Sequence, residues 1–367
     1  MTAYASRLSA KEVQALDAAK LYYAGLTQQE VAQRLHVSRP TVSKLLAYAH
    51  RRGFVRIEIH DPREQDPMLL ETLRERFNLL DVRLVSPVGP GEDLLRTALG
   101  REAAGLLSSL VRDGDRIGVV GSRTLVELAR SLEPVPRHNV ELVQMARGLL
   151  PAERGLDEEA CLVRMAQAFD ARLHLLDMPL VLGTIAERND LHRAPQGRRL
   201  MEMVDQVRIA LFTVGEIHSD LQHLGHEVLS AAECEALIER GAGDLCSHFI
   251  DVHGRICLPD LTHRTTGITL AELRRKEQRI LVAGGQAKAP VIRAALANGY
   301  VNRLITDVSA ARGVLEIDDA LAARHGAVRD RAHLAPGSAR VAHMFQVSTS
   351  APTSHPSQRL QVDFSLQ

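Results

Sequence analysis

Three helix-start signals within the first forty residues constrain this chain more than any other feature. Ser9, Thr27 and Ser38 each precede a stretch with helical apolar spacing, and Glu30 follows Thr27 in the pattern of a capping box. Pro40 stands in the first turn after Ser38, where its missing N–H costs nothing. The signals predict helices over residues 9–24, 27–35 and 38–50, with a short turn at 36–38.

The second and third predicted helices have the organisation of a helix-turn-helix. The N-terminal end of the third helix is polar, as in a helix that enters the major groove of DNA. We expect base edges to be contacted by Arg39, Thr41, Ser43 and Lys44. We expect phosphates to be contacted by Thr27, Gln28, Arg51 and Arg52. The alternating stretch 54–59 predicts a wing strand; an ordinary three-helix bundle with a solvated basic face is the alternative.

Charge is distributed unevenly along a chain whose formal net charge is zero. Residues 1–56 hold nine Lys or Arg against three Asp or Glu, a net charge of +6, so the remainder carries −6. A basic end on an acidic body is expected when only that end meets a polyanion. The distribution therefore favours DNA as a partner of the N-terminal region.

Composition excludes several other classes of protein. A chain of 367 residues exceeds what one core usually holds, so at least two domains are expected. The sequence contains no run of eighteen apolar residues and no signal-peptide pattern, so neither a membrane protein nor a secreted protein is expected. The four cysteines form no CxxC pair, which is typical of a reducing cytoplasm. The histidines of 218–226 match no zinc-site spacing, so neither a metal nor a cofactor is expected.

Beyond residue 60 the pattern changes to that of an α/β domain. Short apolar runs alternate with helical stretches, which predicts a mainly parallel, doubly wound sheet with helices on both faces. The expected strands are 82–85, 117–120, 140–145, 173–176, 209–214, 280–283 and 304–305. The expected helices are 68–77, 92–112, 123–132, 157–169, 230–240, 269–277, 287–298 and 309–316. The expected domains are 1–60 for DNA binding, 61–80 as linker and coupling helix, 81–332 as effector domain and 333–367 as a disordered tail.

Two strand-to-helix junctions carry residues suited to an anionic ligand. The first, the phosphate loop, consists of Gly121, Ser122, Arg123 and Thr124 and offers backbone N–H groups, hydroxyls and a guanidinium. The second, the glycine turn, holds Gly284, Gly285 and, one turn into the helix, Lys288. Taken singly, each junction could be a plain turn.

Residues 18–59 resemble the N-terminal region of the SorC/DeoR-type regulators, those of sorbitol and deoxyribonucleoside operons. The family's block LYY-x-GLTQQE, followed by SRPTVS and LL, stands here as LYYAGLTQQE and SRPTVSKLL. Further along, the family's phosphate-loop motif GDxIGVSWGxTL compares with GDRIGVVGSRTL at 114–125, and VAGGxxKxxAI with VAGGQAKAPVI at 282–292. Segments 241–251 and 261–273 also match family motifs. The resemblance implies a winged helix-turn-helix, an effector domain similar to ribose-phosphate isomerases and glucosamine-phosphate deaminases, and assembly as a dimer or tetramer.

The chain departs from the family pattern at its ligand-binding motifs. Residues 142–148 read LVQMARG, with Ala146 and Arg147 where the family often has Asn and Gly. The tryptophan of the phosphate-loop motif is also absent. Arg147 adds a cation that could meet a second acidic group, and Asp244 is expected to bond a sugar hydroxyl or cap a turn.

These observations predict a DNA-binding regulator of a sugar, polyol or nucleoside catabolic operon, controlled by a phosphorylated sugar or polyol. The alternative is a sugar-phosphate isomerase or deaminase with an attached DNA-binding domain. No convincing acid-base pair stands at a strand end, so no catalytic residue is expected. A Schiff base between Lys288 and an open-chain sugar is a variant of the first hypothesis.

Overall fold

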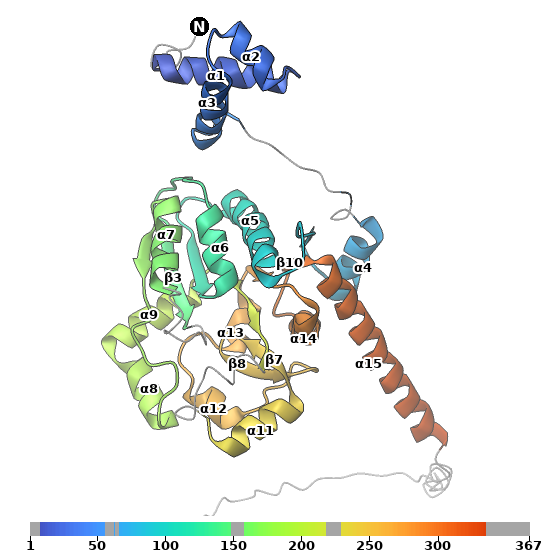
Figure 1. The fold of residues 1–367 in the computed structure, drawn as a ribbon. Coiled ribbons are helices and arrows are strands. Elements are labelled where there is room, and N and C mark those ends of the chain that lie inside the picture. The colour runs from blue at the N-terminus through green and yellow to red at the C-terminus, as the bar shows by residue number, and fades with distance from the viewer. Residues whose placement is uncertain (1–7, 56–61, 63–65, 148–157, 218–228, 335–367) are drawn as a thin grey trace, which may run out of the picture. The chain divides into compact units, whose positions relative to one another are not determined.

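A computed structural model describes residues 8–55, 62, 66–147, 158–217 and 229–334 (Figure 1). The chain divides into two compact units, residues 1–65 and 66–367, and each is considered by itself. Most of the wing strand predicted at 54–59 (residues 56–59), the histidines of 218–226 and most of the predicted tail fall outside the described residues.

The first unit is built from the three helices that the capping signals predict. They are α1 (Ala10–Tyr23), α2 (Gln28–Arg34) and α3 (Arg39–Arg51). The Ser9 and Thr27 side chains each accept a hydrogen bond from a backbone N–H three residues on, and Glu12 and Glu30 return the bond, so both capping boxes are complete. A small core closes between the helices, formed chiefly by Ala15, Ala18, Val31, Val42, Leu45 and Ala49.

The second unit is organised by a parallel sheet. Among the described residues, seven strands lie in the order β1-β10-β9-β5-β2-β3-β4, and every neighbouring pair is parallel. Their bounds are Asp81–Val85 (β1), Arg116–Val120 (β2), Glu141–Ala146 (β3), Arg172–His174 (β4), Ile209–Phe212 (β5), Gln278–Val282 (β9) and Arg303–Asp307 (β10). All the carboxyl ends therefore meet at one edge of the sheet, as predicted for the α/β domain.

Helices cover both faces of this sheet because its strands present apolar side chains to both sides. In β9, Ile280 and Val282 pack into one core, whereas Leu281 packs into the other. One face is covered by α5 (Glu92–Leu110), α6 (Arg123–Ser131) and α7 (Glu158–Phe169). The other is covered by α4 (Pro67–Phe77), α9 (Pro195–Asp205), α13 (Leu270–Arg275), α14 (Ala289–Ala297) and the start of α15 (Val308–Leu334). Helix α4, predicted as a coupling helix, packs on β1 and α15 within the second unit.

The structure corrects the prediction of one strand over 209–214. Strand β5 ends at Phe212, and β6 (Val214–Gly215) joins a second sheet, so the apolar run is shared by two sheets. That sheet, three-stranded within the described part of the chain, is antiparallel and continues through β7 (Gly241–Leu245) and β8 (His248–Asp251). Neither β7 nor β8 was predicted, because Gly241 and Gly243 break the apolar pattern.

Three helices of the described residues were also not predicted, namely α8 (Ile185–Arg193), α9 and α12 (Pro259–Arg264). Helix α15 runs well past the predicted end at 316.

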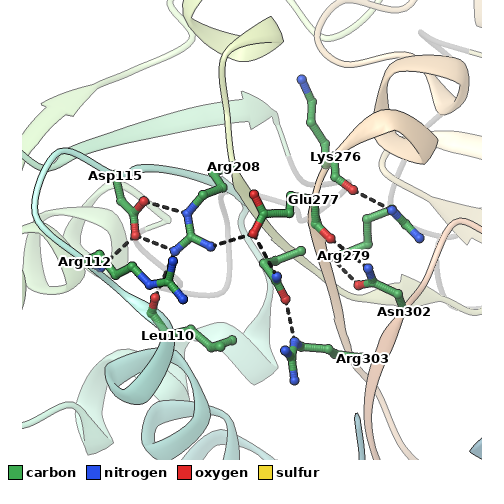
Figure 2. A network of polar contacts seen from close by, with 10 residues as sticks. Leu110, Arg112, Asp115, Arg208, Lys276, Glu277, Arg279, Asn302 and Arg303 are labelled. Atoms are coloured by element: carbon green, nitrogen blue, oxygen red, sulfur yellow. Dashed lines mark hydrogen bonds and ion pairs between the residues drawn. The ribbon is translucent and has the colours of Figure 1, made fainter. Parts of the chain in front are cut away.

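A network of ion pairs and hydrogen bonds joins the amino ends of the central strands (Figure 2). Arg208, before β5, makes two 2.6 Å bonds to the carboxylate of Asp115, before β2, and a third of 3.1 Å to Glu277, before β9. Asn302 accepts from the Arg279 N–H and donates to the Glu277 carbonyl, which extends the network to β10. The amino edge of the sheet is therefore held by polar contacts that fix strand register.

We predict that Asp115→Asn lowers the free energy of unfolding of the second unit by about 3 kcal/mol, because it leaves a largely buried guanidinium without its carboxylate. The side chains of Asp115 and Arg208 are 8% and 19% exposed. Asp190→Asn is the matched control, since the Arg193–Asp190 pair is 3.8 Å apart with both side chains more than three-quarters exposed, and it should cost about 0.5 kcal/mol or less. Urea unfolding measures the free energy of unfolding of both variants. Equal losses would contradict the stabilising role assigned to the Asp115–Arg208 ion pair.

The same carboxylate should contribute to acid sensitivity. Burial raises the pKa of Asp115, but hydrogen bonds from Arg208 and from the Arg112 N–H outweigh it, so the pKa lies below its ordinary value. A depressed carboxyl pKa stabilises the fold above the unfolded-state pKa, and this contribution disappears as pH falls through the folded-state pKa. Asp115→Asn should therefore lose less stability than the wild type below about pH 4.

Candidate DNA-binding surface and effector site

The N-terminal end of α3 presents three of the four predicted base-reading residues to solvent. Arg39, Ser43 and Lys44 are exposed. Thr41 is half-buried, and its hydroxyl lies 2.8 Å from that of Ser38, which caps the helix. The structure therefore brings Arg39, Ser43 and Lys44 together, whereas the Thr41 hydroxyl is already engaged in the cap.

The predicted phosphate contacts are distributed differently. Gln28 and Arg39 line a hollow where α2 and α3 begin, together with Tyr22, Gly25, Leu26, Thr27 and Gln29. The Thr27 hydroxyl donates to Glu30 within its capping box. Arg51 is exposed at the end of α3.

Arg52 has a structural partner that the sequence did not indicate. Its Nη2 lies 2.5 Å from Oε1 of Glu12 in α1, and its guanidinium lies 5.9 Å from the centre of the Phe54 ring. Hydrogen bonds from Ser9, and then from Arg52, lower the pKa of Glu12, so Glu12 stays ionised in the pair. Arg52 therefore links the end of α3 to α1 inside the unit.

In the second unit, the phosphate loop and the glycine turn lie at the same sheet edge. The phosphate loop follows β2 and the glycine turn follows β9, and both strands pair with β5. The pKa of Glu92, in the first turn of α5, is lowered first by a hydrogen bond from Arg96 and further by the charges of Lys288 and Arg123. The loops that carry Arg123 and Lys288 therefore both lie within electrostatic range of Glu92. Glu92 is a functional candidate that the sequence analysis did not predict, although an acidic residue at the start of a predicted helix was a signal for it.

The phosphate loop is shaped by a cap and by a carboxylate. Ser122 caps α6, its side chain accepting from the Leu125 N–H at 3.2 Å, and Ser122 and Thr124 are both buried. The Gly121 N–H donates to Oε1 of Glu158, at the start of α7, over 3.1 Å. A Cβ at position 121 would lie 2.2 Å from that oxygen, so the close approach requires glycine.

The glycine turn is held in a comparable way by Asp307, at the end of β10. The Gly285 N–H donates to its Oδ1 at 2.6 Å, and Gly285 has φ +94°, which favours glycine. The second oxygen of Asp307 accepts from the N–H groups of Ser309 and Ala310 and so caps α15. Asp307 was also not predicted, although an acid between a strand and a helix is a common cap.

The β7–β8 hairpin carries Asp244 and contacts Arg147. The Ser247 hydroxyl, in the hairpin turn, donates to the Arg147 carbonyl at 2.7 Å. Asp244 lies in β7, opposite Phe249. Cys246 and Ser247 both have positive φ and are buried, so packing holds the turn in a conformation that non-glycine residues seldom adopt. Arg147, directly after β3, is exposed.

The segment 266–268 closes the end of β3 from another side. The Ile268 N–H donates to the Met145 carbonyl at 2.8 Å, and the buried His248 ring bonds the Ile268 carbonyl at 3.0 Å. Gly267, with φ +96°, lies so close that a Cβ would come within 2.5 Å of the Met145 oxygen. The described residues contain no group of three or more His, Cys, Asp or Glu side chains that could hold a metal ion.

Comparisons with known proteins agree with this architecture. Residues 62–316 match the family described as "Putative sugar-binding domain", and residues 15–64 match the MarR family. The deoxyribonucleoside regulator of Bacillus subtilis is 34% identical over 308 residues, which is 83% of this chain and 98% of that protein. The sorbitol operon regulator of Klebsiella pneumoniae is 27% identical and covers 81% of this chain and 96% of its own length. Its full-length crystal structure superposes with a TM-score of 0.67 over 84% of this chain and all of that one.

Within the described residues, no helix is both long and apolar enough to cross a membrane.

We predict that Gly267→Ala destabilises the second unit by about 2 kcal/mol or more, because the new methyl group meets backbone atoms at a positive φ. Gly105→Ala is the control: it lies in α5 with no atom within 4 Å of the added Cβ, and it should stabilise by about 0.5–1 kcal/mol. Thermal unfolding compares the two. A neutral Gly267→Ala would show that the end of β3 is not held by this contact.

Proposed function

The chain belongs to the SorC/DeoR-type transcriptional regulators with a sugar-binding domain, and from this we propose that it controls a sugar, polyol or nucleoside catabolic operon in response to a phosphorylated sugar or polyol. Its named relatives are regulators of transcription, so it is a regulator and not an isomerase or deaminase.

The DNA-binding part of the proposal depends on the exposed, basic start of α3. Arg39 and Lys44 supply charge there, and Ser43 supplies a hydroxyl. One such helix reads only a few base pairs, so we propose that a dimer or tetramer places two heads on a roughly palindromic operator. A regulator that acts on the chromosome of a bacterium works in the cytoplasm, which is the location we propose.

The effector part is supported above all by the strand order, because the phosphate loop after β2 and the glycine turn after β9 stand on either side of β5 at the carboxyl edge of the sheet. Backbone N–H groups at a helix start, together with two cations, suit a phosphate group. We place Arg147 and Asp244 at the remainder of the ligand, where a cation and a carboxylate can bond hydroxyl or acidic groups. Helix α4 is the segment through which we propose that effector binding acts on the DNA-binding unit.

We predict that Arg39→Ala weakens binding to the protein's own promoter DNA by about 1–3 kcal/mol and relaxes sequence preference, because it removes a base-edge contact. Arg51→Ala, which removes the same charge from the last residue of α3, should cost less and do so equally for all sequences, because a phosphate contact carries no sequence information. Fluorescence anisotropy at several salt concentrations measures both. Wild-type binding without salt dependence would refute the DNA-binding assignment.

We predict that a phosphorylated sugar raises the melting temperature of the second unit and that its unphosphorylated form does so much less. A ligand that binds only the folded state stabilises in proportion to the logarithm of its concentration over its Kd. Lys288→Ala should weaken the phosphorylated ligand at least tenfold, about 1.4 kcal/mol. Equal shifts for the phosphorylated and unphosphorylated sugars would show that the site does not read the phosphate.

A further inference from the structure

We propose that Thr213 is a further effector-binding residue, whose hydroxyl donates a hydrogen bond to the effector's phosphate between the phosphate loop and the glycine turn. The inference rests on the proposed function, because it concerns the same ligand site. It adds an uncharged donor to the cations of that site, at a position that the sequence analysis did not single out.

The position of Thr213 follows from the order of the strands. Strand β5 ends at Phe212, so Thr213 is the first residue beyond its carboxyl end. Strand β5 pairs with β2 on one side and with β9 on the other, and the phosphate loop and the glycine turn follow these two strands. The register pairs Leu211 with Val119. Two residues beyond this pair stand Thr213 and Gly121, so Thr213 lies between the two loops, at the level of the start of the phosphate loop.

The side chain of Thr213 belongs to the face of the sheet that α5, α6 and α7 cover. Its neighbours Phe212 and Val214 both pack into the core on the other face, whereas Leu211 packs into the core beneath α5, α6 and α7. Successive side chains of an extended chain alternate between the two faces, so Thr213 follows Leu211 onto this face. The first turn of α6, which begins with Arg123, rises on the same face.

The Thr213 hydroxyl oxygen is buried, and it has no hydrogen-bond partner among the residues that the structure describes. The side chains on either side of it, Phe212 and Val214, are apolar and fully buried. A buried hydroxyl without a partner destabilises a fold, whereas a methyl group of the same size would not. The residue as a whole is only half-buried, so it is not enclosed in a core. A ligand at this edge of the sheet can therefore supply the partner.

A phosphate oxygen is the acceptor that suits this donor. A threonine hydroxyl donates one hydrogen bond, and a bond to an anion is shorter and stronger than a bond between neutral groups. Beyond Thr213 the chain enters β6, where Gly215 pairs with Asp244 of β7. The same stretch of chain thus leads from the phosphate loop towards the carboxylate that we place at the remainder of the ligand. Thr213 stands at the phosphate end of this stretch.

The test is calorimetry of the full-length protein with inorganic phosphate as the probe. Thr213→Val exchanges the hydroxyl for a methyl group of almost the same shape, so it should weaken phosphate binding about tenfold, as expected for the loss of one hydrogen bond to a charged group. Because it removes an unpartnered hydroxyl, the variant should also unfold about 2 °C higher than the wild type when no phosphate is added. Thr213→Ser keeps the hydroxyl and should bind phosphate as tightly as the wild type.

Thr306→Val is the matched control. Thr306 lies in β10, which β9 separates from β5, and its side chain is fully buried. Its hydroxyl also has no hydrogen-bond partner in the part of the chain that the structure describes. The control should therefore raise the melting temperature as Thr213→Val does, whereas its phosphate affinity should equal that of the wild type.

Each outcome decides the inference. If Thr213→Val binds phosphate no more weakly than Thr306→Val, the hydroxyl does not contact the phosphate, and the inference fails while the proposed effector class stands. If Thr213→Val unfolds at a lower temperature than the wild type, the hydroxyl serves the fold, which also overturns the inference. If the wild type binds promoter DNA but no phosphate, the phosphorylated effector itself is refuted, and the inference with it.

Discussion

The parallel pairing of the seven strands described in the larger sheet decides at which edge the phosphate loop and the glycine turn lie. Because all the strands run the same way, their amino ends meet at one edge and their carboxyl ends at the other. At the amino edge, Arg208, Asp115 and their neighbours bond one another and hold the strand register (Figure 2). The carboxyl edge is left to glycine-containing loops and helix starts, which expose N–H groups. The contacts that stabilise the sheet and the loops proposed to bind the ligand thus lie at opposite edges.

At the carboxyl edge, carboxylates from the chain itself bind the N–H groups of the loops. Asp307 binds the Gly285 N–H in the glycine turn and also caps α15. Glu158, the first residue of α7, accepts a hydrogen bond from the Gly121 N–H in the phosphate loop. Two carboxylates of the chain itself therefore hold the two glycine-containing loops at this edge.

The sequence allowed prediction of those parts whose signals are local. Ser9, Thr27 and Ser38 begin helices where expected, because a capping side chain and its N–H partner lie three residues apart. The β7–β8 hairpin could not be predicted, because its turn is Cys246-Ser247, a pair that seldom adopts positive φ and is held so by tertiary packing. The ion pair of Arg52 with Glu12 and the contact of Glu158 with Gly121 could not be predicted either, because they join residues 40 and 37 positions apart. The order of the strands likewise depends on long-range pairing.

The proposed control of DNA affinity by a phosphorylated effector requires that the effector bind the DNA-competent and DNA-incompetent states with different affinities. The most direct test is the Kd for promoter DNA with and without a phosphorylated sugar that raises the melting temperature. We predict a change of at least fivefold in Kd, lost in Lys288→Ala. An unchanged Kd at concentrations that saturate the thermal shift would contradict the account.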